Sequence, residues 1–301
     1  MVRNQELKNL KLEEFDICVI GAGASGAGVA LDATLRGYKV ALIDKNDFCS
    51  ETSSKSTKLI HGGVRYLERA FKQLDLEQLR QVRHGLHERH TLLSLAPHLA
   101  HPIALITPVF SWFEGLYYSI GLKLYGLFAM GDSMPSAKWL SKKDTLKRMP
   151  GLTTKLHSSV VYYDGTFNDS GYTLAMVRTA QKESATVANY IKLESFYKND
   201  AGKIEKAHVK DEITGETFQI KSKLFINCTG PFADDVRLMA DETEENRMRP
   251  SKGVHMVFSS EKLPGKDAML IPETKDGRVV FVKPLGNEVM VGTTDTAYSE
   301  M

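Results

Sequence analysis

The sequence predicts an α/β protein with two interleaved domains. An apolar, β-branched run at Phe15–Ile20 is followed by an Ala-rich helical segment that ends near Gly37, and then by a second apolar run at Lys39–Asp44. This unit has about the 30 residues that a βαβ crossover needs. Residues 185–230 instead form strand-length segments separated by "NDAGK" and "ITGET", which predicts a β-meander ending in the apolar strand Leu224–Cys228. A chain of 301 residues is long enough for two cores.

The remaining segments predict helices before residue 185 and an antiparallel sheet after residue 253. Residues 67–99 have the periodicity of two helices broken near Gly85, and Asp169–Ser184 predicts an amphipathic helix. The longest apolar stretch, Pro108–Gly131, contains Glu114, a lysine and several glycines, so it is a poor membrane-spanning segment. We expect this stretch to form a buried helix rather than an interfacial one.

The composition excludes several classes of protein. With 42% hydrophobic and 25% charged residues the chain is an ordinary globular protein, and a net charge of +2 gives no support for nucleic-acid binding. The three cysteines have no CxxC spacing, which is typical of a reducing compartment. Three histidines, His84, His87 and His90, are spaced by three residues, but no cysteine or carboxylate completes a ligand set, so no metal is expected. The first fifteen residues lack the pattern of a signal or transit peptide.

The turn after the first strand contains a glycine-rich motif that predicts dinucleotide binding. Gly21, Gly23 and Gly26 form G-x-G-x-x-G between a strand and a helix. The first glycine permits the turn, the second lets a diphosphate approach the backbone, and the third lets helix and strand pack. The helix N-terminus supplies free N–H groups to the diphosphate. Asp44 ends the second strand, where a carboxylate can bind a ribose hydroxyl and disfavours a 2′-phosphate.

The segments beyond this unit favour FAD over NAD. A nicotinamide-dependent dehydrogenase would continue with alternating strands and helices, but here the polar loop "SSKSTKLIHGGVRYL" follows, and later a β-meander that leads into "INCTGP". This combination resembles the glutathione-reductase-like FAD fold, in the branch that includes D-amino-acid oxidase and sarcosine oxidase. The resemblance implies that the turn at Cys228–Gly230 closes the nucleotide domain near the cofactor. It also implies that Gly292–Asp295 returns the chain to the flavin.

Six segments narrow the resemblance to one family. They are "TSSKSTKLIHGGVRYLE", "YYDGTFND", "INCTGPFADDVR", "PSKGVHMVF", "GRVVFVKP" and "VGTTDT". Together they resemble the FAD-dependent glycerol-3-phosphate dehydrogenases, which are membrane-associated respiratory enzymes, and the related oxidases. The resemblance implies oxidation of sn-glycerol 3-phosphate to dihydroxyacetone phosphate, with hydride transfer to N5 of FAD. Members of the family continue past residue 301, so we expect a piece of a longer protein, without the C-terminal cap domain and a second phosphate-binding arginine.

The resemblance also implies roles for individual residues. Arg65 would bind the substrate phosphate and Tyr66 would hydrogen-bond substrate, while His61 would accept the hydroxyl proton, with His255 as the competing base. Gly62 would let the backbone lie against the flavin. The complete set expected to bind the cofactor is Gly21, Gly23, Ala24, Ser25, Gly26, Asp44, Lys45, Thr52, Ser53, Ser54, Lys58, Leu59, His61, Gly62, Gly63, Leu193, Thr229, Gly230, Gly292, Thr293, Thr294 and Asp295.

The expected domains are discontinuous, and several alternatives stay open. Residues 15–95, 166–247 and 288–301 are expected to bind FAD, and 96–165 and 248–287 to bind substrate. The expected electron acceptor is a respiratory quinone, with oxygen as the alternative; an amine or amino-acid oxidase and a non-catalytic FAD-binding fragment are the other interpretations. The resemblance implies peripheral contact with the cytoplasmic face of a bacterial inner membrane or with the mitochondrial inner membrane. A homodimer is a further expectation, and no nucleic acid is expected.

Overall fold

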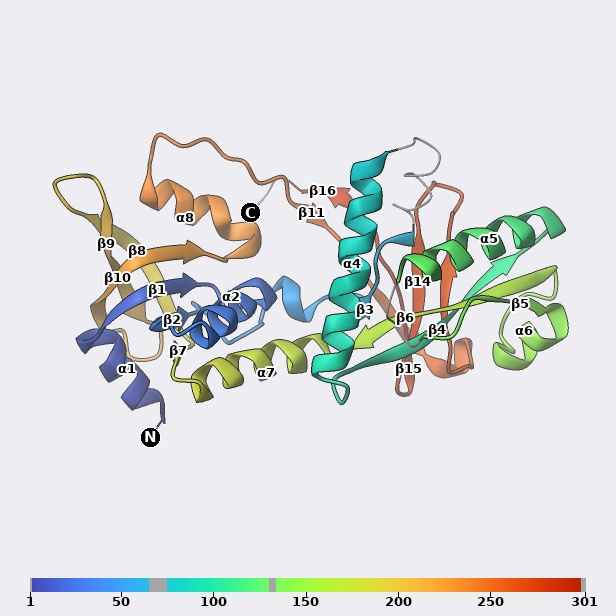
Figure 1. Cartoon of the computed structure of the whole chain (residues 1–301), viewed down its shortest axis with the longest axis horizontal. Coiled ribbons are helices and arrows are strands. Elements are labelled where there is room, and N and C mark those ends of the chain that lie inside the picture. Colours follow the sequence, from blue (N-terminus) through green and yellow to red (C-terminus); the bar gives the residue numbers. More distant parts are fainter. Residues whose placement is uncertain (1, 65–74, 130–133, 299–301) are drawn as a thin grey trace. The chain divides into compact units, whose positions relative to one another are not determined.

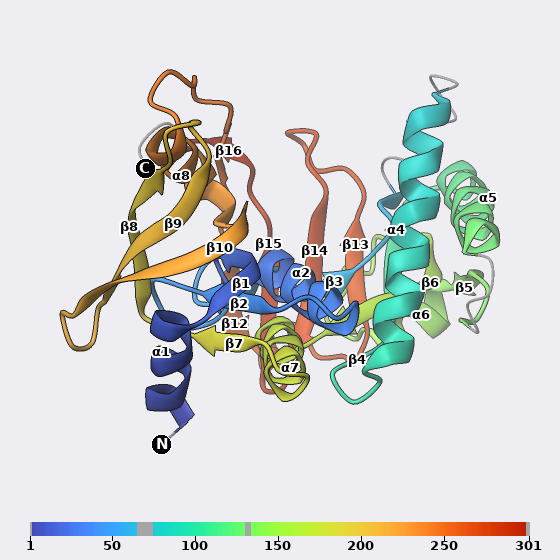
Figure 2. The same cartoon turned by 60° about the vertical axis from the view of Figure 1, so that its left-hand side comes forward.

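The chain folds into two compact units, each built from two separate segments of sequence. The computed structural model describes residues 2–64, 75–129 and 134–298. Unit 1 consists of residues 1–56 and 169–250, and unit 2 consists of residues 57–168 and 251–301. Figures 1 and 2 show the elements of both.

Unit 1 contains a six-stranded mixed sheet with three parallel and two antiparallel pairings. The strand order is β7-β2-β1-β10-β9-β8, in which β7, β2, β1 and β10 run parallel and β10, β9 and β8 form an antiparallel meander. The predicted βαβ unit and β-meander are therefore both confirmed (Figure 1). The elements are α1 (Val2–Leu12), β1 (Glu14–Ile20), α2 (Ala24–Leu35), β2 (Val40–Ile43), η1 (Thr52–Ser54), α7 (Asp169–Lys182), β7 (Thr186–Ala188), β8 (Ile191–Lys198), β9 (Ile204–Asp211), β10 (Thr217–Asn227), η2 (Gly230–Phe232) and α8 (Ala233–Ala240).

The two faces of the parallel strands are buried in different cores. Val19 of β1 and Leu42 of β2 pack with apolar residues of α2 and α7, and the helical segment at Asp169–Ser184 is confirmed as α7. Cys18 and Ile43 face the opposite way and pack with the meander and α1. Because successive side chains of a strand point to opposite faces, a strand buried on both faces has the continuous apolar sequence seen here.

Unit 2 contains an eight-stranded sheet. Its main path is β12-β15-β14-β13-β4-β6-β3, and β5 pairs with β6. A two-stranded ribbon joins β11 and β16. The elements are β3 (Leu59–Ile60), α4 (Leu76–Leu95), β4 (Ala100–Val109), α5 (Trp112–Phe128), β5 (Lys138–Ser141), α6 (Lys142–Arg148), β6 (Ser158–Phe167), β11 (Ser251–Lys252), β12 (Met256–Ser259), η3 (Ser260–Lys262), β13 (Ala268–Ile271), β14 (Val280–Leu285), β15 (Glu288–Gly292) and β16 (Thr296–Ala297).

Helices α4 and α5 pack on one face of this sheet (Figure 2). Leu86 of α4 and Tyr125 of α5 share a core with Tyr162 of β6, whereas Val161 faces a second core on the other side. The expected break near Gly85 is wrong, since α4 is continuous through that residue. A glycine in a helix costs only about 1 kcal/mol relative to alanine, and here it permits the close approach of another backbone segment.

The expectation of a buried helix at Pro108–Gly131 is correct for one face only. Gly115, Ser119, Leu122 and Tyr125 of α5 are buried. The opposite face exposes six large apolar side chains: Trp112, Phe113, Leu116, Tyr117, Ile120 and Leu127. Among the residues that the structure describes, no helix is long and apolar enough to cross a membrane.

The compact units and the expected domains divide the chain at different places. Residues 57–64, 75–95 and 288–298, expected with the nucleotide-binding strands, have their contacts in unit 2. The reason is strand pairing that the local sequence does not encode, because β3 pairs with β6 and β15 pairs with β14. Assignment of either unit to cofactor or substrate stays a prediction.

Candidate functional site

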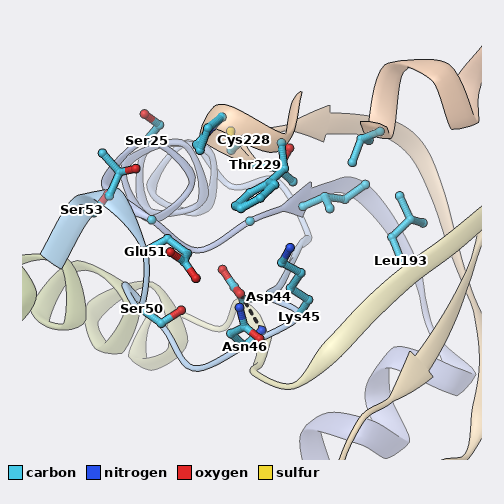
Figure 3. Close-up of a pocket in the computed structure, with 18 of the residues that line it drawn as sticks. Ser25, Asp44, Lys45, Asn46, Ser50, Glu51, Ser53, Leu193, Cys228 and Thr229 are labelled. Atoms are coloured by element: carbon cyan, nitrogen blue, oxygen red, sulfur yellow. Dashed lines mark hydrogen bonds between the residues drawn. The ribbon is translucent and has the colours of Figure 1, made fainter. Parts of the chain in front are cut away.

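A cavity of about 330 Å³ opens in unit 1 at the carboxyl ends of β1, β2 and β10 (Figure 3). This volume falls within the roughly 300–1,000 Å³ of ligand pockets. In a parallel sheet, ligands bind at the carboxyl ends of the strands. The cavity brings together these residues of the expected cofactor set: Gly21, Gly23, Ala24, Ser25, Asp44, Lys45, Thr52, Ser53, Leu193, Thr229 and Gly230.

The glycine-rich turn is fitted tightly against the end of β10. Gly21 has φ +98, and a Cβ at this position would lie 2.6 Å from the carbonyl oxygen of Cys228. Helix α2 then begins at Ala24, after Gly23 as its N-cap, with no side-chain capping bond. The amide of Ala24 donates to Oγ of Ser53 at 2.9 Å, which holds the polar loop beside this N-terminus. The turn therefore presents backbone N–H groups and the positive end of a helix dipole to the cavity.

Asp44 and Lys45 are two of the charged residues that line the cavity. The Asp44 carboxylate accepts hydrogen bonds from the amides of Ala22 at 2.7 Å and Asn46 at 2.9 Å. Burial raises the pKa of this carboxyl group, and the bond from Asn46 opposes the increase. Each oxygen retains a lone pair for a ribose hydroxyl. The Lys45 ammonium lies 3.8 Å from the centre of the Phe232 ring, and Figure 3 shows Lys45 pointing into the cavity.

Sequence reasoning missed part of the lining. Some of these residues lie in the loop after β2 and others in η2 and α8, where the local sequence resembles any polar loop or amphipathic helix. Only the proximity of the Cys228–Gly230 turn could have suggested the second group. The missed residues are Ile20, Asn46, Cys49, Ser50, Glu51, Ile191, Lys192, Pro231, Phe232, Asp235, Val236 and Met239.

A second group of expected residues gathers in unit 2 around His61. The His61 ring stacks on Phe281 of β14, with ring centres 5.5 Å apart and planes at 22°. Its Nδ1 accepts a hydrogen bond from the amide of Gly63 at 3.2 Å, so the neutral imidazole carries its proton on Nε2. His61 as a residue is exposed, but the packed surroundings of its imidazole and then the charge of Arg89 lower its pKa. His61 is thus neutral at physiological pH.

The second histidine, His255, lies where two expected motifs meet. Its Nε2 is 2.9 Å from Oγ1 of Thr57. Its ring lies against Gly292, where a Cβ would be 2.5 Å from Cδ2 of the imidazole. The amide of Val254 donates to Oγ1 of Thr294 at 2.9 Å, which joins the "KGVH" and "GTTD" segments. Burial and then the charge of Lys58 lower the pKa of His255.

The other expected residues have varied positions. Gly26 lies in the first turn of α2, where it packs on Gly21, and Ser54 donates to the carbonyl oxygen of Glu51 at 2.9 Å. The carbonyl oxygen of Lys58 accepts from Nζ of Lys283, and Leu59 pairs with β6. In the rest of the expected set, Thr293 donates to the carbonyl oxygen of Thr294, Asp295 is exposed, and Arg65 and Tyr66 lie outside the described residues. Across the described part of the chain, no group of three His, Cys, Asp or Glu could hold a metal ion.

Comparison with known proteins decides the family. The model of the family described as "FAD dependent oxidoreductase" matches residues 16–300. The chain belongs to this FAD-dependent oxidoreductase family. Among its relatives is a probable mitochondrial glycerol-3-phosphate dehydrogenase of Caenorhabditis elegans, 45% identical over 97% of this chain and 41% of that protein. The mitochondrial glycerol-3-phosphate dehydrogenase of Homo sapiens is 46% identical over 94% of this chain and 40% of its own length.

Solved structures of other flavoproteins have the same fold. The glycerol-3-phosphate dehydrogenase of Bacillus halodurans, complexed with FAD, matches with a TM-score of 0.78 and 30% identity, over 99% of this chain and 51% of that one. The L-alpha-glycerophosphate oxidase of Mycoplasma pneumoniae, with FAD bound, matches with a TM-score of 0.71 and 18% identity, over 96% of this chain and 73% of that one. The chain spans about two fifths of the length of the curated relatives it matches.

The cavity of unit 1 fits the nucleotide end of FAD, the cofactor of this family. Three features agree with an adenine dinucleotide: a helix N-terminus whose N-cap residue is a glycine without a side chain, a carboxylate at the end of β2, and apolar walls formed in part by Ile191 and Leu193. The fold and the cofactor predicted from the sequence are confirmed by the family match.

Proposed function

We propose that this chain is the FAD-binding part of an enzyme that oxidises sn-glycerol 3-phosphate to dihydroxyacetone phosphate. The similarity to glycerol-3-phosphate dehydrogenases over nearly the whole chain supports this proposal. The observation that carries it is the meeting of three distant segments in unit 2. His255 bonds to Thr57 just before the His61 loop, and it packs on Gly292, so motifs of one family assemble around two neutral imidazoles.

Unit 1 holds the nucleotide in this proposal. The N-terminus of α2 binds the diphosphate, and Asp44 accepts a hydrogen bond from a ribose hydroxyl. Ser53 sets the position of the polar loop through its bond to the Ala24 amide. FAD, when bound, supplies the acceptor for the hydride that leaves C2 of the substrate.

Unit 2 provides the base. Oxidation removes a hydride from C2 and a proton from its hydroxyl group, so a basic nitrogen must accept that proton. His255 can be this base, because when Nε2 donates to Oγ1 of Thr57, Nδ1 keeps the lone pair that accepts the proton. His61 has the opposite arrangement, because Gly63 occupies Nδ1 and Nε2–H is a donor. We therefore assign the base to His255 and the hydrogen bond to a substrate or flavin oxygen to His61. Arg65 and Tyr66 retain their proposed contacts with substrate.

Anaerobic flavin reduction tests this function. The purified chain, loaded with FAD, is mixed with sn-glycerol 3-phosphate, and the oxidised-flavin absorption is followed. The expected result is bleaching with this substrate and none with its enantiomer. A His255→Gln variant should bind FAD normally but reduce it at least about a hundredfold more slowly. FAD that is bound but stays oxidised would contradict the proposal and favour a non-catalytic FAD-binding fragment.

The electron acceptor is proposed to be a respiratory quinone rather than oxygen. This assignment follows from the similarity to mitochondrial dehydrogenases, whereas the similar glycerophosphate oxidase shares only 18% identity. Turnover with a short-chain quinone should therefore greatly exceed oxygen consumption measured with the same enzyme and substrate. Oxygen consumption equal to quinone reduction would contradict the assignment.

We further infer that α5 attaches the protein peripherally to the inner membrane of mitochondria or of a bacterium. Its exposed stripe includes Phe113, which is 78% exposed, and Leu127, which is 71% exposed, with Lys123 between them. Exposed aromatic residues with a nearby cation are typical of an interfacial helix. Phe113→Asp combined with Ile120→Asp should reduce the fraction bound to anionic vesicles more than about tenfold. The control is Leu35→Asp, at a residue on α2 that is 63% exposed. An equal loss of vesicle binding in both variants would refute the role of the exposed face of α5.

A further inference from the structure

A buried chain of hydrogen bonds lies beneath the His61 loop. Arg89 of α4, Asp164 of β6 and Tyr125 of α5 are 2%, 1% and 1% exposed. The Arg89 guanidinium forms an ion pair with Asp164, and the Tyr125 hydroxyl lies 3.1 Å from both carboxylate oxygens. The amide of Gly62 donates to the same hydroxyl at 2.7 Å. Three elements thus converge on a single backbone N–H group.

The donor and the acceptor of each hydrogen bond in this network are fixed. The Gly62 amide can only donate, so the Tyr125 oxygen accepts and its O–H is left to donate to Asp164. Arg89 stabilises the ionised carboxylate that receives it. Burial, followed by the Asp164 charge, raises the pKa of Tyr125 well above its ordinary value, so the hydroxyl keeps its proton. Successive bonds of this kind strengthen one another in a low-dielectric interior.

Gly62 is also confined by packing on α4. A Cβ at Gly62 would lie 2.6 Å from Cγ of Leu86 and 3.1 Å from the carbonyl oxygen of Val82. A Cβ at Gly85 would lie 3.2 Å from Cα of Gly62, which explains why a glycine is placed within this helix. The loop therefore packs against α4 on one side, and its Gly62 amide is hydrogen-bonded to Tyr125. Gly62 directly follows His61 in the sequence.

We propose that Tyr125, with Asp164 and Arg89 behind it, is a positioning residue that fixes the His61 loop through the amide of Gly62. The inference rests on the proposed function, because it assigns a use to the position of His61. Tyr125 itself touches neither substrate nor cofactor in this proposal. Its contribution is to hold His61 and Gly63 in one geometry, so that Nε2–H of His61 is presented in a constant direction.

Tyr125→Phe tests the proposal, and Tyr162→Phe is its matched control. Both tyrosines are almost completely buried, and their rings meet edge to face with centres 6.2 Å apart. The hydroxyl of Tyr162 has no hydrogen-bond partner among the described residues, whereas that of Tyr125 accepts from Gly62. Each substitution removes one buried oxygen of equal size, but only the first releases the loop.

The first measurement is hydrogen exchange at the Gly62 amide, which needs no turnover. In protein with glycine labelled by ¹⁵N, Tyr125→Phe should accelerate this exchange about tenfold or more, and Tyr162→Phe should leave it within about twofold. Other glycines of unit 2, such as Gly121 on α5 and Gly165 on β6, report on the stability of this unit in the same sample. Equal acceleration at Gly62 in both variants, or at every glycine, would overturn the proposal.

The second measurement separates positioning from stability. With FAD bound, Tyr125→Phe should lower the rate of flavin reduction at saturating sn-glycerol 3-phosphate by about 10–100-fold, with KM nearly unchanged. Tyr162→Phe should reduce flavin at the wild-type rate. A wild-type rate in Tyr125→Phe would overturn the positioning role, even if that variant melts earlier. Absence of reduction in the wild-type chain would instead contradict the proposed function, while the exchange measurement would still test the hydrogen bond.

Discussion

Replacing Gly62 by alanine should destabilise unit 2, and removing the Leu86 side chain should relieve part of that effect. The new Cβ would lie 2.6 Å from Cγ and 2.8 Å from Cδ2 of Leu86, which is 1% exposed and has little room to move. Overpacking of this kind costs about 1–3 kcal/mol, and the loss of backbone freedom in the unfolded chain returns about 0.4–1 kcal/mol. A net loss of about 1–2 kcal/mol in the free energy of unfolding is expected.

Combining Gly62→Ala with Leu86→Ala measures the steric clash as a coupling energy between the two positions. Leu86→Ala alone should cost about 2–5 kcal/mol, because it removes buried apolar atoms and leaves a cavity. In the double variant the new methyl group enters that cavity, so the combined loss should be about 1–2 kcal/mol smaller than the sum of the single losses. Relief should be incomplete, since the carbonyl oxygen of Val82 remains 3.1 Å from the new Cβ.

Urea unfolding followed by tryptophan fluorescence measures these free energies of unfolding for unit 2. The chain has two tryptophans, Trp112 and Trp139, and both lie in unit 2. Gly121→Ala is the control, because this glycine is exposed on α5 and a Cβ there meets nothing within 4 Å. The control should gain up to about 1 kcal/mol from helix propensity. Additive losses in the double variant would refute the contact between the loop and α4.

Three further predictions concern the two clusters. The pKa of His61 is lowered from 6.5 in the folded chain, so below about pH 6.5 the unfolded chain binds a proton that the folded chain does not. The free energy of unfolding should therefore fall as the pH decreases from that value. In urea titrations at several pH values, His61→Gln should show a smaller fall than the wild type. Gly21→Ala places a side chain at φ +98 and 2.6 Å from the Cys228 carbonyl oxygen, so the FAD content of the purified protein should fall more than about tenfold. Cys228 lines the cavity, so FAD should slow its alkylation, whereas Cys18, whose pKa burial raises to about 12, should stay unlabelled with and without FAD in peptide mass spectra.

Local patterns were sufficient for the nucleotide-binding unit. The apolar run before Gly21, the glycine spacing and the carboxylate at Asp44 are signals contained within 30 residues, and the hairpin turns at "NDAGK" and "ITGET" specify their own strands. The structure confirms these elements because each depends on its immediate neighbours.

The buried network could not be predicted in the same way. Arg89 lies in a helical segment where most charged residues face solvent, and Tyr125 lies in an apolar stretch where an aromatic residue is usually packing. Only pairing of β4 with β6 and packing of two helices on this sheet bring Asp164 to both of them. A single sequence holds no signal that these three residues come together. The exposed apolar face of α5 was also missed, because apolar residues occur on both the buried and the exposed sides of this helix.

The alternation of the chain between the two units has a consequence for folding during synthesis. The central strand β1 has β10 as its parallel neighbour, with Phe15 opposite Ser222, a separation of 207 positions. Until the ribosome has released β10, one edge of β1 offers unpaired N–H and C=O groups, and that edge can pair with another chain. Closing so long a loop also delays the sheet, because its entropy is lost before the contacts form. Unit 1 should therefore need chaperone protection until β10 is released, and the sheet of unit 2 is completed later still, because β4 pairs with β13 from the last part of the chain.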